Sequence, residues 1–204
     1  MTTPAIPYSR WAPLSVPEVV QRFSGAPFSW GFAGGYAIEL FLGYPIRAHD
    51  DIDVLVFRDQ QLTVQHWLGG WQLFAADPPG TLRPWRAGEA LAYGIHDIWG
   101  HERQSDAWQL QLMLAETAGD EWFSRRDQRV RGRRDDLFVP YNGLPCLRVE
   151  IQLFWKAHNR RPKDEQDFSA CLPRLDSRGR AWLADQLRLL YSEDHPWLTR
   201  LSSV

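Results

Sequence analysis

Two aspartates lie close together at the start of an apolar segment. Asp51-Ile52-Asp53 leads directly into residues 54–57, a run typical of a buried β-strand. Because side chains alternate between the two faces of a strand, we expect Asp51 and Asp53 on the same face. Neighbouring carboxylates repel each other, and carboxylate oxygens are ligands that Mg²⁺ prefers. The spacing therefore predicts a site for a divalent cation.

A pair of glycines precedes these aspartates. Gly34-Gly35 follows a short apolar run and opens a helix-like segment, residues 36–42, which Gly43 ends. Glycines at a strand-to-helix turn let backbone N–H groups approach an anion, and a helix N-terminus favours negative charge. A glycine turn followed by an aspartate pair predicts a site for a metal-bound nucleoside triphosphate.

Several cationic side chains are candidates for contact with the phosphates. Of the 23 basic residues, only Lys156 and Lys163 are lysines, and a compact ammonium meets a phosphate differently from a planar guanidinium. The alternative is that these two lysines occur by chance. Arg47 and His49 lie between the glycines and the aspartates, and either they contact phosphate or they pair with Asp50 or Asp51 and hold the loop.

Composition sets limits on the type of protein. The chain has 204 residues and a net charge of about −2, which does not favour nucleic acid or an anionic membrane as a partner. No apolar run approaches the ~20 residues that span a bilayer. Residues 1–10 lack the pattern of a signal peptide, and two cysteines form neither a disulfide framework nor a zinc motif. A reducing cytoplasm is the expected location.

The pattern of elements predicts an α+β protein, with a mixed sheet and flanking helices followed by a helical part. The predicted boundary separates residues 1–140 from residues 141–204. Apolar and alternating runs predict strands at residues 28–32, 52–57, 71–75, 93–99 and 107–115. Helical spacing and capping signals predict helices at residues 16–24, 36–42, 60–68, 150–158, 163–171 and 178–190.

The combined pattern resembles the nucleotidyltransferase superfamily with the DNA polymerase β-type fold. The shared signature is Gly-Gly, a gap of 15 residues, and Asp-Ile-Asp before an apolar residue. The longer pattern of Gly-Gly-aromatic-Ala, Leu-Gly and Arg-x-His-x-Asp-Ile-Asp is similar to the branch that contains aminoglycoside and lincosamide nucleotidyltransferases. The resemblance extends over about residues 30–167. Its downstream part comprises Arg125-Arg126, Glu150, Lys156, Lys163-Asp164 and Asp167.

The resemblance implies an enzyme of antibiotic resistance that moves a nucleoside monophosphate, with ATP as the expected donor, onto a hydroxyl of a small acceptor such as an aminoglycoside-like compound. Gly34 and Gly35 would hold the triphosphate, and Asp51 and Asp53 would bind two Mg²⁺ ions. A lysine from the helical part would approach the phosphates, Lys163 before Lys156 by position.

A third carboxylate, on a neighbouring strand, typically completes such sites and takes the proton of the acceptor hydroxyl. The strand expected to carry it, residues 107–115, offers Gln111 on its polar face, and an amide is not a base. Glu116 lies just past this strand and is the first candidate. Asp97 and Asp106 are further candidates, and the absence of any third carboxylate is another alternative.

Two other functions remain open from the sequence. One is a nucleotide-binding regulatory protein, of the toxin–antitoxin type, that keeps the aspartate pair without efficient catalysis. The other is a transferase that modifies protein or tRNA, supported by the arginine-rich residues 125–134, which are otherwise a solvated face. A cationic aminoglycoside would require an acidic pocket. The acidic candidates for it are Glu89, Asp97, Glu102, Asp106, Glu116, Asp120 and Glu121.

Overall fold

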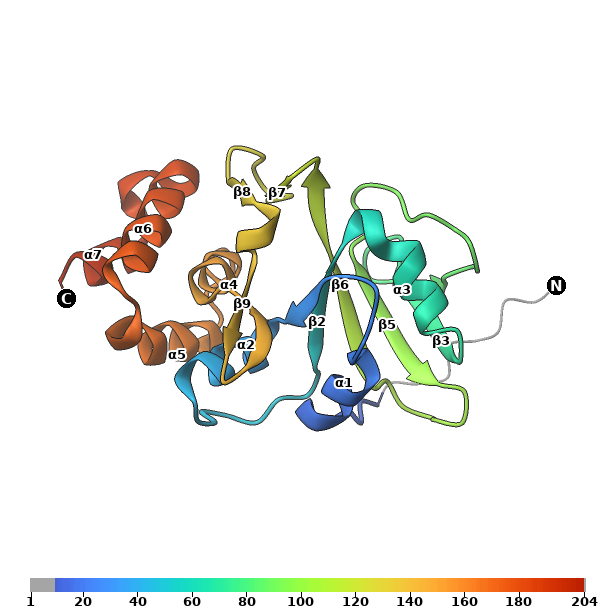
Figure 1. Cartoon of the computed structure of the whole chain (residues 1–204). Helices are drawn as coiled ribbons and strands as arrows, with labels where there is room; N and C mark the ends of the chain where they lie inside the picture. Colours follow the sequence, from blue (N-terminus) through green and yellow to red (C-terminus); the bar gives the residue numbers. More distant parts are fainter. Residues whose placement is uncertain (1–9, 204) are drawn as a thin grey trace.

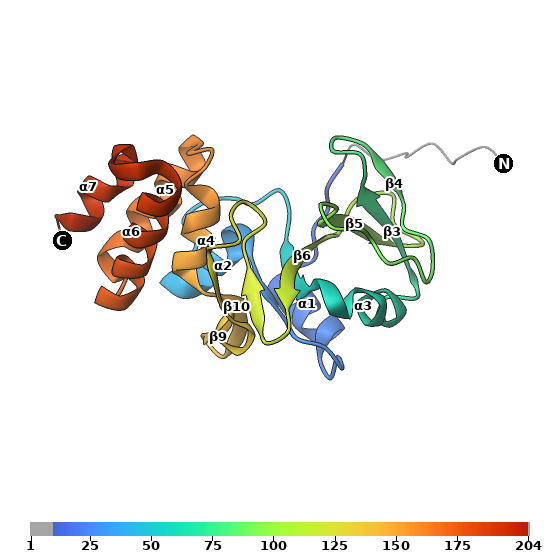
Figure 2. The same ribbon diagram turned by 90° about the horizontal axis from the view of Figure 1, so that it is seen from above.

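A computed structural model describes residues 10–203, and Figure 1 shows a β-sheet with helices on both of its faces and a helical bundle at one end of the molecule. The first nine residues, to which the absence of a signal peptide refers, lie outside that range. Seen from above, helices α5, α6 and α7 lie farthest from strands β3 and β4 (Figure 2). No helix of the described part is long and apolar enough to cross a membrane. The architecture is α+β, as the sequence predicts.

The strands form one mixed sheet, in the order β4-β3-β5-β6-β2-β1-β10-β9. β2 pairs with β6 in parallel and with β1 antiparallel, so it lies near the centre of the sheet. β7 and β8 extend from the end of β6. The strands are β1 (Trp30–Phe32), β2 (Asp53–Phe57), β3 (Trp71–Ala76), β4 (Leu82–Pro84), β5 (Asp97–Glu102), β6 (Leu110–Ala118), β7 (Glu121–Phe123), β8 (Arg131–Arg133), β9 (Phe138–Tyr141) and β10 (Leu144–Leu147).

The helices divide between the two faces of the sheet. Strand β2 shows why: Val54 and Val56 pack with α1 and α3, whereas Leu55 and Phe57 pack with α2, α4 and α6. Alternation along one strand thus supplies both hydrophobic cores. The helices are α1 (Val16–Phe23), α2 (Gly34–Leu42), α3 (Gln61–Trp67), α4 (Val149–Lys156), α5 (Pro162–Cys171), α6 (Ser177–Tyr191) and α7 (Pro196–Ser202).

The strands predicted at residues 93–99 and 107–115 begin later than the sequence predicts, because the backbone before each of them forms hydrogen bonds with other groups. Arg58 donates hydrogen bonds to the carbonyl oxygens of Leu91, Ala92 and Ile95, which holds this segment as a loop until β5 begins. Before β6, the N–H of Trp108 donates to the carbonyl of Arg10. The pairing partners in both cases are distant in sequence, and local alternation does not reveal them.

The C-terminal part contains more elements than predicted. The short strands β7 to β10 were not predicted, because three or four residues carry little periodicity, and helix α7, two turns long, was not predicted either. β10 pairs in parallel with β1, so the sheet continues to Leu147 and the predicted division at about residue 140 falls within β9. Helix α4 begins two residues after β10 and packs against α2.

Candidate functional site

The aspartate pair lies at the N-terminal end of β2, in the wall of a cavity of about 370 Å³. Within residues 10–203, the Asp53 carboxylate makes no hydrogen bond and no ion pair. Burial, followed by the charge of Asp51, raises the pKa of Asp53 to about 7. A partly buried carboxylate beside another carboxylate is costly to ionise without a counter-charge. This pair is a ready acceptor of a cation.

Gly34 connects the glycine turn directly to the aspartates. Its backbone has a φ of +62°, and a Cβ atom placed there would lie 1.9 Å from Oδ2 of Asp53. The Gly34 N–H donates to Oε1 of Gln152 at 2.7 Å. Gly35 and Tyr36 follow in the first turn of α2, where N–H groups have no partner within the helix. An anion is therefore expected to bind at the N–H groups of Gly35 and Tyr36, at the positive end of the helix.

Arg47 and His49 hold the loop between α2 and β2. The Arg47 guanidinium pairs with both oxygens of Asp167 at 3.2 Å, and its Nη1 lies 2.9 Å from Nδ1 of His49. The other ring nitrogen of His49 lies 2.9 Å from Oε1 of Glu39. A Cβ on Gly35 would collide with the His49 ring, so the loop packs tightly under the turn. Both side chains thus hold the loop, but their partners are Asp167 and Glu39 and not the expected Asp50 or Asp51, because α2 and α5 bring these distant carboxylates to the loop.

The two lysines have different surroundings. Nζ of Lys156 is buried and lies 2.8 Å from Asp167 and 3.4 Å from Asp164, both of which are fully buried. Lys163 is exposed at the cavity wall and makes no ion pair or hydrogen bond within the described part of the chain. Lys163 is therefore the lysine whose charge is free to meet a ligand. Asp164 is buried and accepts a hydrogen bond from the N–H of Arg161 at the start of α5.

The three candidates for the third carboxylate all have a protein partner, and Asp106, paired with Arg10, lies outside the cavity wall. Glu116 lies at the cavity wall, but Arg58 Nε and Nη2 each donate to one of its oxygens at 2.6 Å. Gln111 stands opposite Asp53 in the pairing of β2 with β6, and its amide donates to Asp97 Oδ1 at 3.3 Å. Asp97 is not in the cavity wall, whereas Gln111 is. Burial raises the pKa of Asp97, and the charge of Asp97 contributes to the raised pKa of Asp53.

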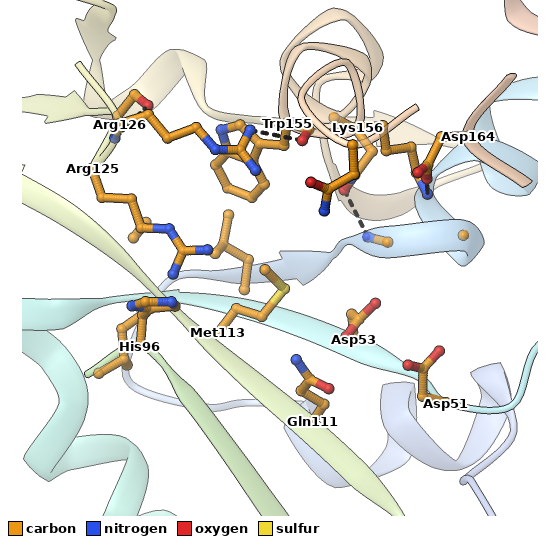
Figure 3. Close-up of a pocket in the computed structure, with 18 of the residues that line it drawn as sticks. Asp51, Asp53, His96, Gln111, Met113, Arg125, Arg126, Trp155, Lys156 and Asp164 are labelled. Carbon is orange, nitrogen blue, oxygen red and sulfur yellow. Dashed lines mark hydrogen bonds and ion pairs between the residues drawn. The ribbon is translucent and has the colours of Figure 1, made fainter. Parts of the chain in front are cut away.

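The arginine-rich segment separates into two groups. Four of its arginines pair with carboxylates: Arg129 with Asp127, Arg131 with Glu121, Arg133 with Asp135 and Arg134 with Asp59. The other two, Arg125 and Arg126, line the cavity. Figure 3 shows them across the cavity from Asp51 and Asp164, with Met113 in between. The segment is thus neither uniformly a solvated face nor uniformly a binding surface.

The sequence analysis did not predict three contacts of the site. They are the hydrogen bond from the Gly34 N–H to Gln152, the Arg58–Glu116 ion pair, and the hydrogen bond from Arg126 Nη1 to the Trp155 carbonyl at 2.7 Å. Gln152 was detectable, because it precedes Lys156 by four residues and so shares its face of the helix. The other two join residues distant in sequence, and no local signal marks them.

A family model for aminoglycoside-2''-adenylyltransferase matches residues 15–171. The chain belongs to this family. Members of the aminoglycoside-2''-adenylyltransferase family are nucleotidyltransferases, so the chain is placed among enzymes that use a nucleotide co-substrate. The matched region contains the glycine turn, the aspartate pair and both lysines.

Solved structures share the fold. The lincomycin-bound lincosamide antibiotic adenylyltransferase LnuA is 16% identical, with a TM-score of 0.53 over 78% of this chain and 97% of that chain. The complex of ANT(2'')-Ia with adenylyl-2''-tobramycin is 16% identical, with a TM-score of 0.52 over 84% and 94%. The solution structure of ANT(2'')-Ia is 15% identical, with a TM-score of 0.55 over 87% and 91%. No curated protein matches the sequence.

The donor set of this family member fits a magnesium ion. Asp51 and Asp53 offer carboxylate oxygens that have no partner among the described residues, and burial, followed by the charge of Asp51, raises the pKa of Asp53. Within residues 10–203 no group of three or more His, Cys, Asp or Glu side chains gathers to hold a metal. A site with two protein carboxylates matches the usual coordination of Mg²⁺, which keeps several water ligands and binds oxygens of substrate phosphates.

Proposed function

We propose that this protein is a Mg²⁺-dependent nucleotidyltransferase that moves AMP from ATP onto a hydroxyl of a small acceptor. The observation that carries the proposal is the unpartnered carboxylate of Asp53, held against Gly34 at the N-terminus of α2 in the wall of a cavity. The carboxylate that would bind the metal and the glycine turn that would bind the phosphates thus lie side by side.

Five residues of the cavity have distinct roles in the proposed reaction: Asp51, Asp53, Gly35, Lys163 and Lys156. Asp51 and Asp53 would hold Mg²⁺, which would supply stabilisation of the charge on the transferring phosphate. The free N–H groups at Gly35 and Tyr36 receive the triphosphate, and exposed Lys163 adds a charge beside them. Because Lys156 is neutralised by two buried aspartates, its part is to fix α4 against α5.

We propose Asp97, in place of Glu116, as the general base that accepts the proton of the acceptor hydroxyl. Both Glu116 oxygens are taken by a guanidinium, which holds the group as a carboxylate with little affinity for a proton. Asp97 accepts an amide bond from Gln111 and lies 3.3 Å from Nε2 of His96, and burial raises its pKa, which increases its affinity for a proton. Gln111 and His96 both line the cavity and orient Asp97 from that side.

The two alternatives from the sequence have less support. A regulator without chemistry does not account for membership in a family of transferases. A macromolecular substrate was suggested by the arginine-rich segment alone, and four of its arginines are occupied by carboxylates. A small acceptor also fits a cavity of about 370 Å³.

The proposal is tested by incubating the protein with Mg²⁺, labelled ATP and a panel of hydroxylated compounds that includes tobramycin and lincomycin, the ligands of the two similar structures. We expect pyrophosphate release together with an adduct that is heavier by one AMP. Asp51→Asn and Asp53→Asn should each abolish both signals. Turnover that persists in the double variant would remove the proposed function. The same assay with each nucleoside triphosphate in turn defines the donor.

A further inference from the structure

The end of the cavity away from the glycine turn carries positive charge without a matching negative charge. Arg125 lines this end and makes no hydrogen bond or ion pair within residues 10–203. Arg126, beside it, donates to the Trp155 carbonyl at 2.7 Å and pairs with no carboxylate of the described residues, and both arginines are exposed at this end of the cavity. Burial, followed by the charge of Arg126, lowers the pKa of Arg125 to about 10. The two guanidiniums repel each other and lack a counter-ion.

The acidic side chains that the sequence suggested for a cationic acceptor do not supply that counter-ion. Glu116, the one of them in the cavity wall, is neutralised by Arg58. Glu89 pairs with Arg83. Three others pair with arginines outside the cavity wall: Glu102 with Arg22, Asp106 with Arg10 and Glu121 with Arg131. Asp97 accepts from Gln111, and neither Asp97 nor the exposed Asp120 lines the cavity. None of the seven candidates therefore supplies a free carboxylate to the cavity wall among the described residues.

The triphosphate does not account for the two arginines. The groups proposed to bind the triphosphate, the N-terminus of α2 and Lys163, lie at the opposite end of the cavity. Arg125 and Arg126 lie across the cavity from that end (Figure 3). Between the two ends the cavity is bordered by Met113 and Trp155, which give a flat apolar surface for a ring. The cavity thus has a cation-binding centre with a basic subsite on its far side.

We propose that Arg125 and Arg126 form a subsite for an anionic group of the acceptor, so that the compound modified carries a carboxylate or phosphate beside its hydroxyls and not several ammonium groups. The inference rests on the proposed function for the word acceptor, but the subsite itself is a binding property. A guanidinium pair presents paired N–H donors that match the oxygens of either anion. A polycation such as an aminoglycoside would meet like charge there.

A panel on one ring scaffold tests the charge preference. Glucose, glucosamine, glucuronate and glucose 6-phosphate present similar hydroxyls with no charge, an ammonium, a carboxylate and a phosphate, and tobramycin adds a polycation. Affinities are measured by calorimetry on the full chain saturated with Mg²⁺ and a non-hydrolysable ATP analogue, so that the triphosphate site is already filled. We expect the two anions to bind about tenfold or more tightly than glucose. The ranking of glucuronate and glucose 6-phosphate identifies the anion.

Matched variants assign the preference to the subsite. Arg125→Gln and Arg126→Gln should each remove most of the preference for anions, and Arg125→Lys should restore part of it. Arg133→Gln is the control, because that side chain is 74% exposed and approaches only Asp135 at 3.8 Å. The affinity for the ATP analogue alone, measured in each variant, should stay within about twofold of the wild type.

Three results would overturn the inference. The first is that glucosamine or tobramycin binds as tightly as the anions. The second is that affinity does not depend on the charge of the compound. The third is that Arg125→Gln loses as much affinity for the ATP analogue as for the anions. The last result would make the arginines part of the nucleotide site. If the anions bind through Arg125 but no compound receives AMP, the subsite stands and the proposed function fails, so the two failures are distinguishable.

Discussion

A Cβ atom on Gly34 would lie 1.9 Å from Oδ2 of Asp53. The glycine of the phosphate turn and the aspartate of the metal pair thus occupy adjoining space, although 18 residues separate them in the sequence. The approach requires a residue without a side chain at position 34, and the φ of +62° favours glycine there as well. The turn and the carboxylates form one unit.

Gly34→Ala should therefore abolish binding of the Mg²⁺–ATP analogue, because the new methyl group displaces the Asp53 carboxylate. Gly25→Ala is a matched control. Gly25 has a φ of +72° but nothing within 4 Å of its Cβ position, so only backbone strain of about 1 kcal/mol is expected. Calorimetry and denaturant unfolding separate the two effects. Normal nucleotide binding by Gly34→Ala would show that the close approach is dispensable.

Asp53→Asn should stabilise the metal-free protein at pH 8 while abolishing turnover. The pKa of Asp53 is raised to about 7 by burial and by Asp51, so the folded protein holds a proton that the unfolded chain releases at about 3.9. Stability from this group is complete below pH 4 and is lost as the pH rises through 7. Because Asp53 is partly exposed, we expect a gain on the order of 2 kcal/mol at pH 8 and none at pH 4.

Thermal unfolding of the wild type and Asp53→Asn at both pH values measures this difference. Mg²⁺ should stabilise the wild type at pH 8 and leave the variant unchanged. Asp135→Asn, at a side chain that is 86% exposed, is the control. Equal stability of the wild type and Asp53→Asn at pH 8 without metal would contradict the assignment of a strained, unpaired carboxylate.

Asp97→Asn should lower kcat by about 100-fold or more, the usual contribution of a general base. It should also remove the acidic limb of the pH–rate profile. Glu116→Gln should instead lower stability by about 1–3 kcal/mol, because it leaves the charge of Arg58 without its carboxylate. Steady-state kinetics and unfolding of both variants decide between the residues. A folded Glu116→Gln without turnover, beside an active Asp97→Asn, would reverse the assignment.

The same substitution at the two lysines should have opposite effects. Lys163→Gln should raise the KM for ATP about tenfold with unchanged stability, because this exposed side chain has no protein partner. Lys156→Gln should cost about 3 kcal/mol of stability, because Asp164 and Asp167 are fully buried around it. Each variant controls for the other in kinetics and unfolding. A large rise of KM in a stable Lys156→Gln would make Lys156 the phosphate ligand.

By itself the sequence determined the parts of the site that are local. Gly34-Gly35 before a helix, and Asp51 and Asp53 before an apolar run, are read from neighbouring residues. Alternation along β2 and the helix signals then placed both motifs at ends of elements. The order of these motifs sufficed for the family, and the α+β class followed from the periodicities.

The tertiary structure alone decided which charges are free. Arg58 meets Glu116, and Arg47 meets Asp167, across 58 and 120 residues of sequence. Such pairs depend on how strands and helices are brought together, and no local pattern encodes them. They leave Asp53, Lys163 and Arg125 without partners among the described residues, and these unpaired charges determine what the cavity can bind.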